Sequence, residues 1–392
     1  MTATVLCLKK GRSRAGFMRD AKQAGVTLEP IAGLKRHFRA EGDVSAIADH
    51  PAIEAMSDAD RVIPPPAVQS ITLDNLLVGG SWALARTIRR GAPWNVDHVK
   101  SPIDTFYRYE RDGTGVDIYV VDSGIELAHA EFGGRATNVY EYASSGGAGD
   151  DFGHGTAVAS VAAGATAGPA RGALLWSFKS STSSAGGSTD LSLVTALGQL
   201  NAHYAGRAGL NRPAVVNLSI NPVHGATVVS AIGDLIDDGL VCVQSAGNDK
   251  AELVIGTYPA AFTADSIIAG GTGIADIPYF YGLDGTNYGS AVHILAPGIA
   301  VRVAAAAVRA AGDYEARRGT SFSSPLVAGV IACMLQGHNR LTTRAQVQAV
   351  KTKLLANATT GKLRTAYGLT PLPDKILYLD PDQVAPETIA GL

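Results

Sequence analysis

From about residue 91 onward, the chain alternates short apolar runs with segments of helical periodicity, and this alternation restricts the fold more than any other feature. The apolar runs that predict strands are residues 116–121, 174–178, 214–219, 240–244, 266–269 and 292–295. The segments that predict helices are residues 154–163, 189–204, 226–237, 321–335 and 343–355. Strands that are apolar throughout and alternate with helices are typical of a parallel sheet covered on both faces. The sequence therefore predicts a three-layer α/β domain with a mostly parallel central sheet, whose ligand site lies outside the carboxyl ends of the strands.

A smaller α/β module is predicted ahead of this domain. Residues 4–8 predict a strand, and Ser13 is placed to cap a helix that runs to about Ala24. The triple proline at residues 64–66 interrupts regular structure, because proline fixes φ and restricts the residue before it. We therefore divide the chain into a module at 1–63, a linker at 64–90, a large domain at 91–380 and a C-terminal tail at 381–392.

The composition argues against several kinds of partner. The net charge is −2 and shows no basic bias, so we expect neither nucleic acid nor a membrane as a partner. Cys7, Cys242 and Cys333 are too widely spaced for a metal motif and predict reduced, mostly buried thiols. The apolar run at residues 5–8 is too short for a secretory signal. We expect a location inside a cell or in an assembled particle rather than classical secretion.

Three polar residues are placed where they could carry chemistry. Asp122 ends a buried strand, where a carboxylate is costly unless another group pairs with it. His154 opens an apolar helix, whose N-terminus disfavours a protonated imidazole and so keeps a base available. Ser321 lies in the first turn of another buried helix, close to free main-chain N–H groups. A serine is a weak nucleophile alone and needs an adjacent base.

Taken singly, each of the three residues has an ordinary explanation as a turn aspartate, a structural histidine or a helix N-cap. In the order Asp, His, Ser they match the chain order of subtilisin. The segments Val121-Asp122-Ser123-Gly124, Gly153-His154-Gly155-Thr156 and Gly319-Thr320-Ser321 with Pro325 resemble the three signatures of the subtilase family, in particular its proteinase K branch. Further similar segments are Ser245-Ala246-Gly247-Asn248, Ala296-Pro297-Gly298 and Ala92-Pro93-Trp94. The resemblance covers about residues 91–380.

The resemblance implies a subtilisin-like fold and a serine endopeptidase that works through an acyl-enzyme. Ser321 would attack the peptide carbonyl, His154 would take and return the proton, and Asp122 would orient His154. Asn248 would stabilise the oxyanion. The segments expected to bind a protein or peptide substrate contain Ser219, Ile220, Asn221, Ser245, Ala246 and Gly247. Residues 1–63 resemble a subtilase pro-region, which implies a zymogen whose retained module acts as folding aid and intramolecular inhibitor.

The chain departs from the family pattern at two places that bear on function. Asn221 and Pro222 stand where the family has two glycines, which predicts a narrowed or reshaped substrate cleft. His293 stands where the proteinase K branch has an aspartate that binds calcium, and imidazole is a poor ligand for this oxygen-preferring cation. We therefore predict no metal-ligating residues and no required cofactor. A structural calcium ion stays open, since Asp265, Asp276 and Asp284 could form another site.

A second class of function remains open from the sequence. A subtilase scaffold with a silent site could serve as a structural or binding component of a larger assembly, such as a virus particle. The altered cleft and the retained module favour this alternative. The presence of Asp122, His154, Ser321 and Asn248 together favours the enzyme. An α/β-hydrolase esterase is disfavoured, because its chain order is Ser, Asp, His.

Overall fold

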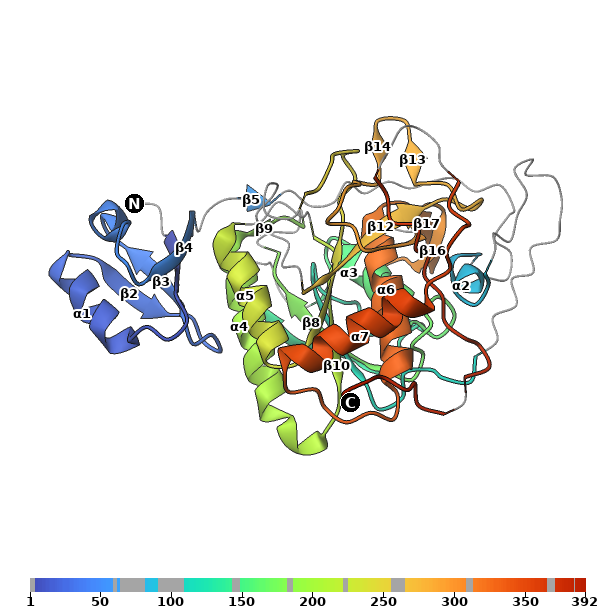
Figure 1. Cartoon of the computed structure of the whole chain (residues 1–392), viewed down its shortest axis with the longest axis horizontal. Helices are drawn as coiled ribbons and strands as arrows, with labels where there is room; N and C mark the ends of the chain where they lie inside the picture. Colours follow the sequence, from blue (N-terminus) through green and yellow to red (C-terminus); the bar gives the residue numbers. More distant parts are fainter. Residues whose placement is uncertain are drawn as a thin grey trace.

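A seven-stranded parallel sheet forms the centre of the computed structural model (Figure 1). Its strand order is β15-β12-β11-β10-β6-β8-β7, and every neighbouring pair is parallel. The strands are β6 (Asp117–Asp122), β7 (Ala136–Glu141), β8 (Leu174–Lys179), β10 (Ala214–Leu218), β11 (Val241–Ser245), β12 (Ile267–Thr272) and β15 (Ile294–Pro297). The structure describes residues 4–58, 62–63, 82–90, 109–142, 149–181, 186–220, 225–254, 265–307, 313–364, 371–383 and 385–392. The predicted α/β class and parallel sheet are confirmed.

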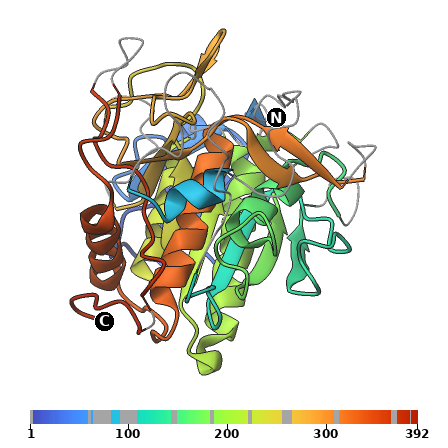
Figure 2. The same cartoon turned by 90° about the vertical axis from the view of Figure 1, so that its right-hand side faces the viewer.

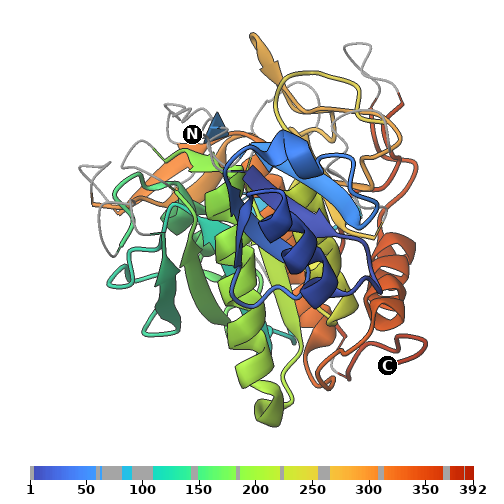
Figure 3. The ribbon, with the colours of Figure 1, turned by 90° about the vertical axis from the view of Figure 1, so that its left-hand side faces the viewer.

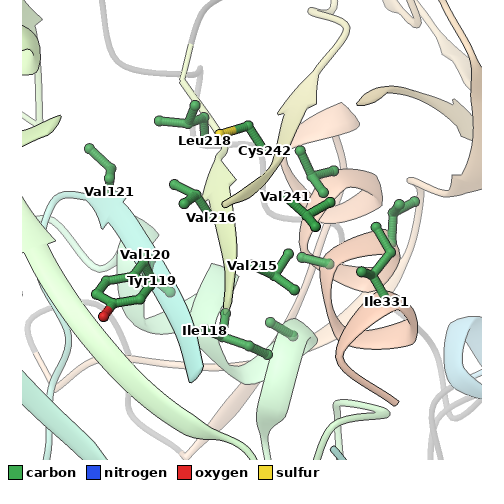
Figure 4. Packing of buried hydrophobic residues seen from close by; sticks show 14 of the residues in the cluster. Ile118, Tyr119, Val120, Val121, Val215, Val216, Leu218, Val241, Cys242 and Ile331 are labelled. Atoms are coloured by element: carbon green, nitrogen blue, oxygen red, sulfur yellow. The ribbon is translucent and has the colours of Figure 1, made fainter. Parts of the chain in front are cut away.

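Helices cover both faces of this sheet. On one face lie α3 (His154–Ala163) and α6 (Thr320–Leu335), which pack against each other, and Figure 2 looks onto this side. On the other face lie α4 (Asp190–Gly206) and α5 (Ala226–Asp237), and α7 (Arg344–Asn357) contacts α5. The central strands are buried on both sides, as their continuous apolar sequence predicts. Figure 4 shows Ile118, Val215 and Val241 from three adjacent strands packed near Ile331 of α6.

The N-terminal module is a four-stranded antiparallel sheet with one helix. Its strands are β1 (Thr4–Leu8), β2 (Thr27–Pro30), β3 (His37–Glu41) and β4 (Ile53–Asp58), in the order β2-β3-β1-β4. The helix α1 (Arg14–Gln23) begins at Ser13, whose hydroxyl accepts from the Gly16 N–H at 3.2 Å. A short 3-10 helix spans Val44–Ile47.

Side chains alternate between the two faces of β1, as a strand requires. Leu6 and Leu8 point into the module's own core with Phe17 of α1. Val5 belongs to the core of the large domain, and the Sγ atom of Cys7 lies 3.0 Å from the Ser230 hydroxyl of α5. One face of the module's sheet therefore packs in the module's own core, and the other face packs against the large domain.

The module packs on the outer side of α4 and α5 (Figures 1 and 3). Arg36 of the module forms an ion pair with Asp234 of α5 at 2.7 Å. The backbones also approach closely: a Cβ atom added to Gly33 would lie 1.7 Å from the main-chain oxygen of Gly198 in α4. This approach requires the absence of a side chain at residue 33.

Two parts of the predicted domain division need correction. Residues 82–90 were assigned to the linker, but α2 (Trp82–Thr87) is buried in the large domain and contacts β15. Arg86 of this helix pairs with the buried Asp276 at 2.7 Å. The tail at 381–392 is also packed, since Ile389 belongs to the main core. The six residues of α2 and the two buried tail residues, Glu387 and Ile389, are too few for a periodic pattern to reveal them.

The remaining elements are short. The two-residue strands β5 (Val62–Ile63) and β9 (Ser188–Thr189) pair with each other, as do β13 (Phe280–Tyr281) with β14 (Asp284–Gly285) and β16 (Val301–Ala304) with β17 (Tyr314–Arg317). A 3-10 turn spans Ala208–Leu210. All three cysteines are buried and unpaired, which confirms the prediction of buried thiols. Among the helices of the described residues, none has the length and apolar character to cross a bilayer.

Candidate active site

Asp122 and His154 form a buried hydrogen-bonded pair at the carboxyl end of the sheet. Asp122 is the last residue of β6, and His154 is the first residue of α3. The Nδ1 atom of His154 lies 2.8 Å from Oδ1 and 3.0 Å from Oδ2 of Asp122. Because a carboxylate only accepts, Nδ1 carries a proton, and in the neutral imidazole Nε2 then keeps its lone pair. Nε2 is buried and makes no hydrogen bond, so this atom is available as a base.

Asp150 holds the start of α3 in place. Its Oδ1 accepts from the Gly153 N–H at 2.7 Å and from the Ser123 hydroxyl at 2.7 Å. Its Oδ2 accepts from the Thr156 N–H at 2.7 Å. These bonds satisfy helix N–H groups that have no partner within the helix. Asp150 thereby holds the start of α3, which carries His154, against the loop that follows Asp122.

Gly155 explains why α3 can begin so close to Asp122. A Cβ atom at residue 155 would lie 2.1 Å from the main-chain oxygen of Gly124 and 3.1 Å from Cβ of Asp122. Any side chain here would push the helix away from β6. The glycine after His154 is therefore a packing requirement of the Asp122–His154 pair.

Ser321 lies in the first turn of α6 and is 3% exposed. Its hydroxyl donates to the main-chain oxygen of Ser219 at 3.4 Å. The ring of Phe322 stands 5.8 Å from that of His154, which packs α6 beside the Asp122–His154 pair. The structure thus brings together the three residues that the sequence selected from β6, α3 and α6.

The Asn248 amide is oriented by Thr320. Its Oδ1 accepts from the Thr320 N–H at 2.8 Å, and an N–H group can only donate, so the amide orientation is fixed. The opposite atom, Nδ2, lies 3.4 Å from the position of a Cβ on Gly319, two residues before Ser321. Ser321 N–H lacks an intrahelical acceptor because it belongs to the first turn of α6. Nδ2 of Asn248 and this N–H supply two donors beside Ser321.

The segments expected to bind substrate follow the adjacent strands β10 and β11. The Ser245 hydroxyl donates to the main-chain oxygen of Ile220 at 2.9 Å and joins the two segments. The Ser219 side chain is directed at α6, where it bonds the Ser321 carbonyl at 2.8 Å. Ala246 is buried, and Gly247 N–H donates to the Thr320 hydroxyl at 2.9 Å. Asn221 lies outside the described residues, so the predicted narrowing of the substrate cleft at this residue stays a prediction.

Three supporting residues were not singled out by the sequence analysis. Asp150 could have been recognised as a capping residue type just before a helix. Thr320 lies within the serine motif, although nothing in the sequence shows that its side chain bridges Gly247 and Asn248. Asn287 is 1% exposed, and its Oδ1 accepts from the N–H groups of Asp249 and Ala251 at 2.9 and 2.8 Å. No local pattern marks Asn287, because its partners are distant in the chain.

The strand β9 runs beside this site and pairs with the end of the module. Ser180 N–H donates to the main-chain oxygen of Asp122 at 2.9 Å, and the Ser180 hydroxyl lies 3.1 Å from that of Ser188 in β9. The backbone of residues 62–63 pairs antiparallel with residues 188–189. The chain leaving the module therefore passes next to the strand that borders the Asp122 loop.

The three aspartates considered for a cation do not form a common site. Asp276 pairs with Arg86, Asp284 pairs with Arg318 and Asp265 pairs with Arg344. Each carboxylate has its own guanidinium, so no shared cluster is left to bind a cation. Among the described residues, no group of three or more His, Cys, Asp or Glu side chains is arranged to hold a metal ion.

A buried nucleophile, an imidazole with a carboxylate behind it and a pair of N–H donors define a serine hydrolase type of site. The model of the subtilase family matches residues 113–369, and the chain belongs to this family.

Relatives with this fold are known as proteases. The chain is similar to alkaline serine exoprotease A of Vibrio alginolyticus, with 31% identity over 80% of this chain and 55% of that protein. It is also similar to the extracellular serine proteinase of Thermus sp. (strain Rt41A), with 31% identity over 75% of this chain and 68% of that protein. The chain thus spans about half the length of the Vibrio relative. A solved cold-adapted subtilisin-like serine proteinase matches with a TM-score of 0.62 and 28% identity, over 76% of this chain and 98% of that one.

Proposed function

We propose that the protein is a serine endopeptidase that hydrolyses peptide bonds in protein or peptide substrates. The observation that carries this proposal is the buried Asp122–His154 pair, which leaves a free Nε2 lone pair beside the helix that presents Ser321. The family and the named relatives support the same chemistry.

The reaction follows from the roles that the geometry allows. Nε2 of His154 takes the proton of the Ser321 hydroxyl while the Ser321 oxygen attacks the carbonyl carbon. The imidazolium that forms is stabilised by Asp122 and returns the proton to the leaving amine, which leaves an acyl-enzyme. Water then repeats the sequence and releases the acid. The oxyanion in both steps accepts from Asn248 Nδ2 and Ser321 N–H.

We further propose that the N-terminal module acts as an intramolecular inhibitor and that the protein is made as a zymogen. Two observations support this role. The module buries one face of its sheet against α4 and α5, and its exit strand β5 pairs with β9 next to the Asp122 loop. An extended chain that pairs with β9 occupies the edge along which a substrate backbone would add as a strand. A proteinase K-like ancestry is consistent with the sequence motifs.

One labelling experiment tests the enzyme and the zymogen together. The full chain is treated with a fluorophosphonate and its intact mass is measured, beside Ser321→Ala and the matched control Ser323→Ala. Ser323 is a neighbouring buried serine whose hydroxyl instead bonds the Ala296 carbonyl at 3.1 Å. We expect one adduct on the wild type and on Ser323→Ala once the module no longer covers the site, and none on Ser321→Ala in either form. The same spectrum reports whether the module has been cut from the chain.

The experiment is repeated after limited proteolysis has removed the module. An adduct that appears only then supports inhibition by the module. If neither form reacts, the peptidase proposal is wrong, and a structural or binding role on a silent scaffold takes its place.

A further inference from the structure

A buried lysine lies next to His293, at the position where the resemblance implies a calcium-binding aspartate. Lys351 belongs to α7 and is 7% exposed. Its Nζ atom donates to the main-chain oxygen of Ser266 at 2.9 Å and lies 2.9 Å from Nε2 of His293. Ser266 precedes β12 and His293 precedes β15, which are neighbouring strands at one edge of the sheet. Lys351 therefore joins α7 to the beginnings of two strands.

The hydrogen bonds of His293 fix its tautomer. The N–H of Ile268 donates to Nδ1 of His293 at 3.0 Å, and an N–H group cannot accept, so Nδ1 is unprotonated. A neutral imidazole with a bare Nδ1 carries its proton on Nε2. The single hydrogen between Nε2 and Nζ thus belongs to His293. Lys351 then accepts this hydrogen through the lone pair of an uncharged amine and donates one of its own hydrogens to Ser266.

This arrangement is incompatible with a metal ion at the same place. Calcium needs six to eight oxygen ligands at about 2.3–2.6 Å. One nitrogen of His293 accepts from Ile268, and the other carries a proton, so His293 has no lone pair left for a cation. The oxygen of Ser266 is directed at Lys351. The residues present do not fit calcium, because their ligand atoms are already committed to one another.

We propose that the Lys351 amine, hydrogen-bonded between His293 and Ser266, takes the place of a calcium ion and closes this position to divalent cations. A bound ion would hold separate segments together, and the Lys351 amine does the same. It connects α7 to the main chain before β12 and to the His293 side chain before β15. The connection is internal to the chain and does not depend on the metal content of the surroundings.

Burial shifts both groups toward their uncharged forms. It lowers the pKa of Lys351 to about 8, so the uncharged amine predominates above that pH, and it lowers the pKa of His293 to about 3. The carboxylate of Asp265 favours a charged Lys351, but Arg344 of α7 pairs with this carboxylate. The Asp265 carboxylate is thus largely neutralised by a neighbour on the same helix as Lys351.

The test measures calcium dependence at this position and separates it from any other calcium site. Thermal unfolding of the full chain, in a Ser321→Ala background that prevents self-cleavage, is recorded in excess EDTA and in excess Ca²⁺. The same pair of measurements is made on His293→Ala and on the control His338→Ala, whose Nε2 lies 2.8 Å from the main-chain oxygen of Glu387. We expect the calcium-dependent shift in unfolding temperature to be the same in all three proteins. A shift that is present in the parent and lost only in His293→Ala would show that His293 ligates calcium and would overturn the proposal.

Two further measurements keep the test decisive if His293→Ala does not fold. The ¹⁵N resonances of the His293 ring in the parent should show a protonated Nε2 and an unprotonated Nδ1, whereas a protonated Nδ1 would overturn the proposal. Lys351→Met keeps the length of the side chain and removes the amine. We expect its unfolding temperature to fall by about 2–4 °C equally in EDTA and in Ca²⁺. An unchanged unfolding temperature would show that the amine does not hold the segments together.

Discussion

The hydroxyl of Ser321 donates to the main-chain oxygen of Ser219 at 3.4 Å and not to the imidazole of His154. A bond of this length is weak, so little free energy opposes rotation of the hydroxyl toward Nε2. Catalytic hydrogen bonds are often long or misaligned before a substrate binds. The resting orientation therefore fits the proposed mechanism if substrate binding turns the Ser321 hydroxyl toward Nε2 of His154.

Asn248→Ala should lower kcat with little change in KM. In the proposed mechanism the Nδ2 donor acts on the oxyanion, which develops only in the transition state. We expect a loss of about 10²–10³ in kcat, the size known for the oxyanion asparagine of subtilisin itself. Steady-state kinetics on a peptide substrate, with the module removed, provide the measurement. A change confined to KM would mean that Asn248 binds the ground state instead.

Thr320→Val should lower kcat about tenfold, less than Asn248→Ala does. The Thr320 hydroxyl donates to Asn248 at 3.1 Å and accepts from Gly247 N–H at 2.9 Å, and valine has the same shape without these bonds. The Thr320 N–H still holds the amide, which limits the loss. Thr320→Ser keeps the hydroxyl and should retain activity. Equal kinetics for the valine and serine variants would contradict this positioning role.

Asp150→Ala should destabilise the protein by roughly 1–3 kcal/mol, because it removes the cap of α3 and leaves buried N–H groups without an acceptor. Activity should fall as well, since the same helix start carries His154. Asp150→Asn retains one acceptor oxygen and should lose less stability. Urea unfolding of both variants in the Ser321→Ala background gives the comparison. Equal stability of the alanine variant and the parent would show that α3 does not depend on this cap.

The contact between the module and α5 should weaken at acidic pH through His37. Burial, followed by the charge of Arg36, lowers the pKa of His37 to about 4 from its usual value of 6.5. Asp234 lies 3.5 Å from Nδ1 and would favour the protonated form, but its ion pair with Arg36 weakens that effect. Glu54 of β4 acts in the same direction as Asp234.

A lowered pKa in the folded state means that the unfolded chain binds more protons between pH 4 and 6.5. The contribution of His37 to the free energy of unfolding is therefore fully present above pH 6.5 and is lost as the pH falls to about 4. The loss is on the order of 3 kcal/mol. His37→Gln should flatten the pH dependence of urea unfolding across this window. A variant that loses stability with pH as steeply as the parent would rule out His37 as the cause.

Gly33→Ala should loosen the module, whereas Gly11→Ala should not. Both glycines have the same left-handed backbone, with φ of 77° and 78°, so alanine costs both a similar strain of about 1–2 kcal/mol. Only at residue 33 does the new Cβ meet the backbone of α4. Faster limited proteolysis of residues 64–81 in Gly33→Ala than in Gly11→Ala is the expected result. Equal rates would mean that the module adapts without separating from α4.

The sequence predicted the secondary structure best in segments where a regular apolar pattern repeats along the chain. The bounds of α3 and α5 match the predicted ranges, because apolar periodicity and adjacent glycines mark both helices. Asp122, His154 and Ser321 could be selected because their chain order and flanking motifs resemble a known family, and the structure places them at the end of β6 and at the starts of α3 and α6. The strand order of the module, the packing of α2 in the large domain and the contact of Lys351 with His293 were not recoverable. They depend on contacts between residues far apart in the chain, which no local pattern records.

The surface between the module and α5 closes a very long loop, since Arg36 and Ser230 are 194 positions apart and yet bond at 3.1 Å. While the chain is continuous, the two surfaces stay at a high effective concentration whatever the amount of protein in solution. A single cut between residues 64 and 81 would remove this advantage and turn the closure into an association of two separate chains. After such a cut, dilution would favour release of the module from the large domain. The same contact would then persist at high protein concentration and dissociate at low concentration.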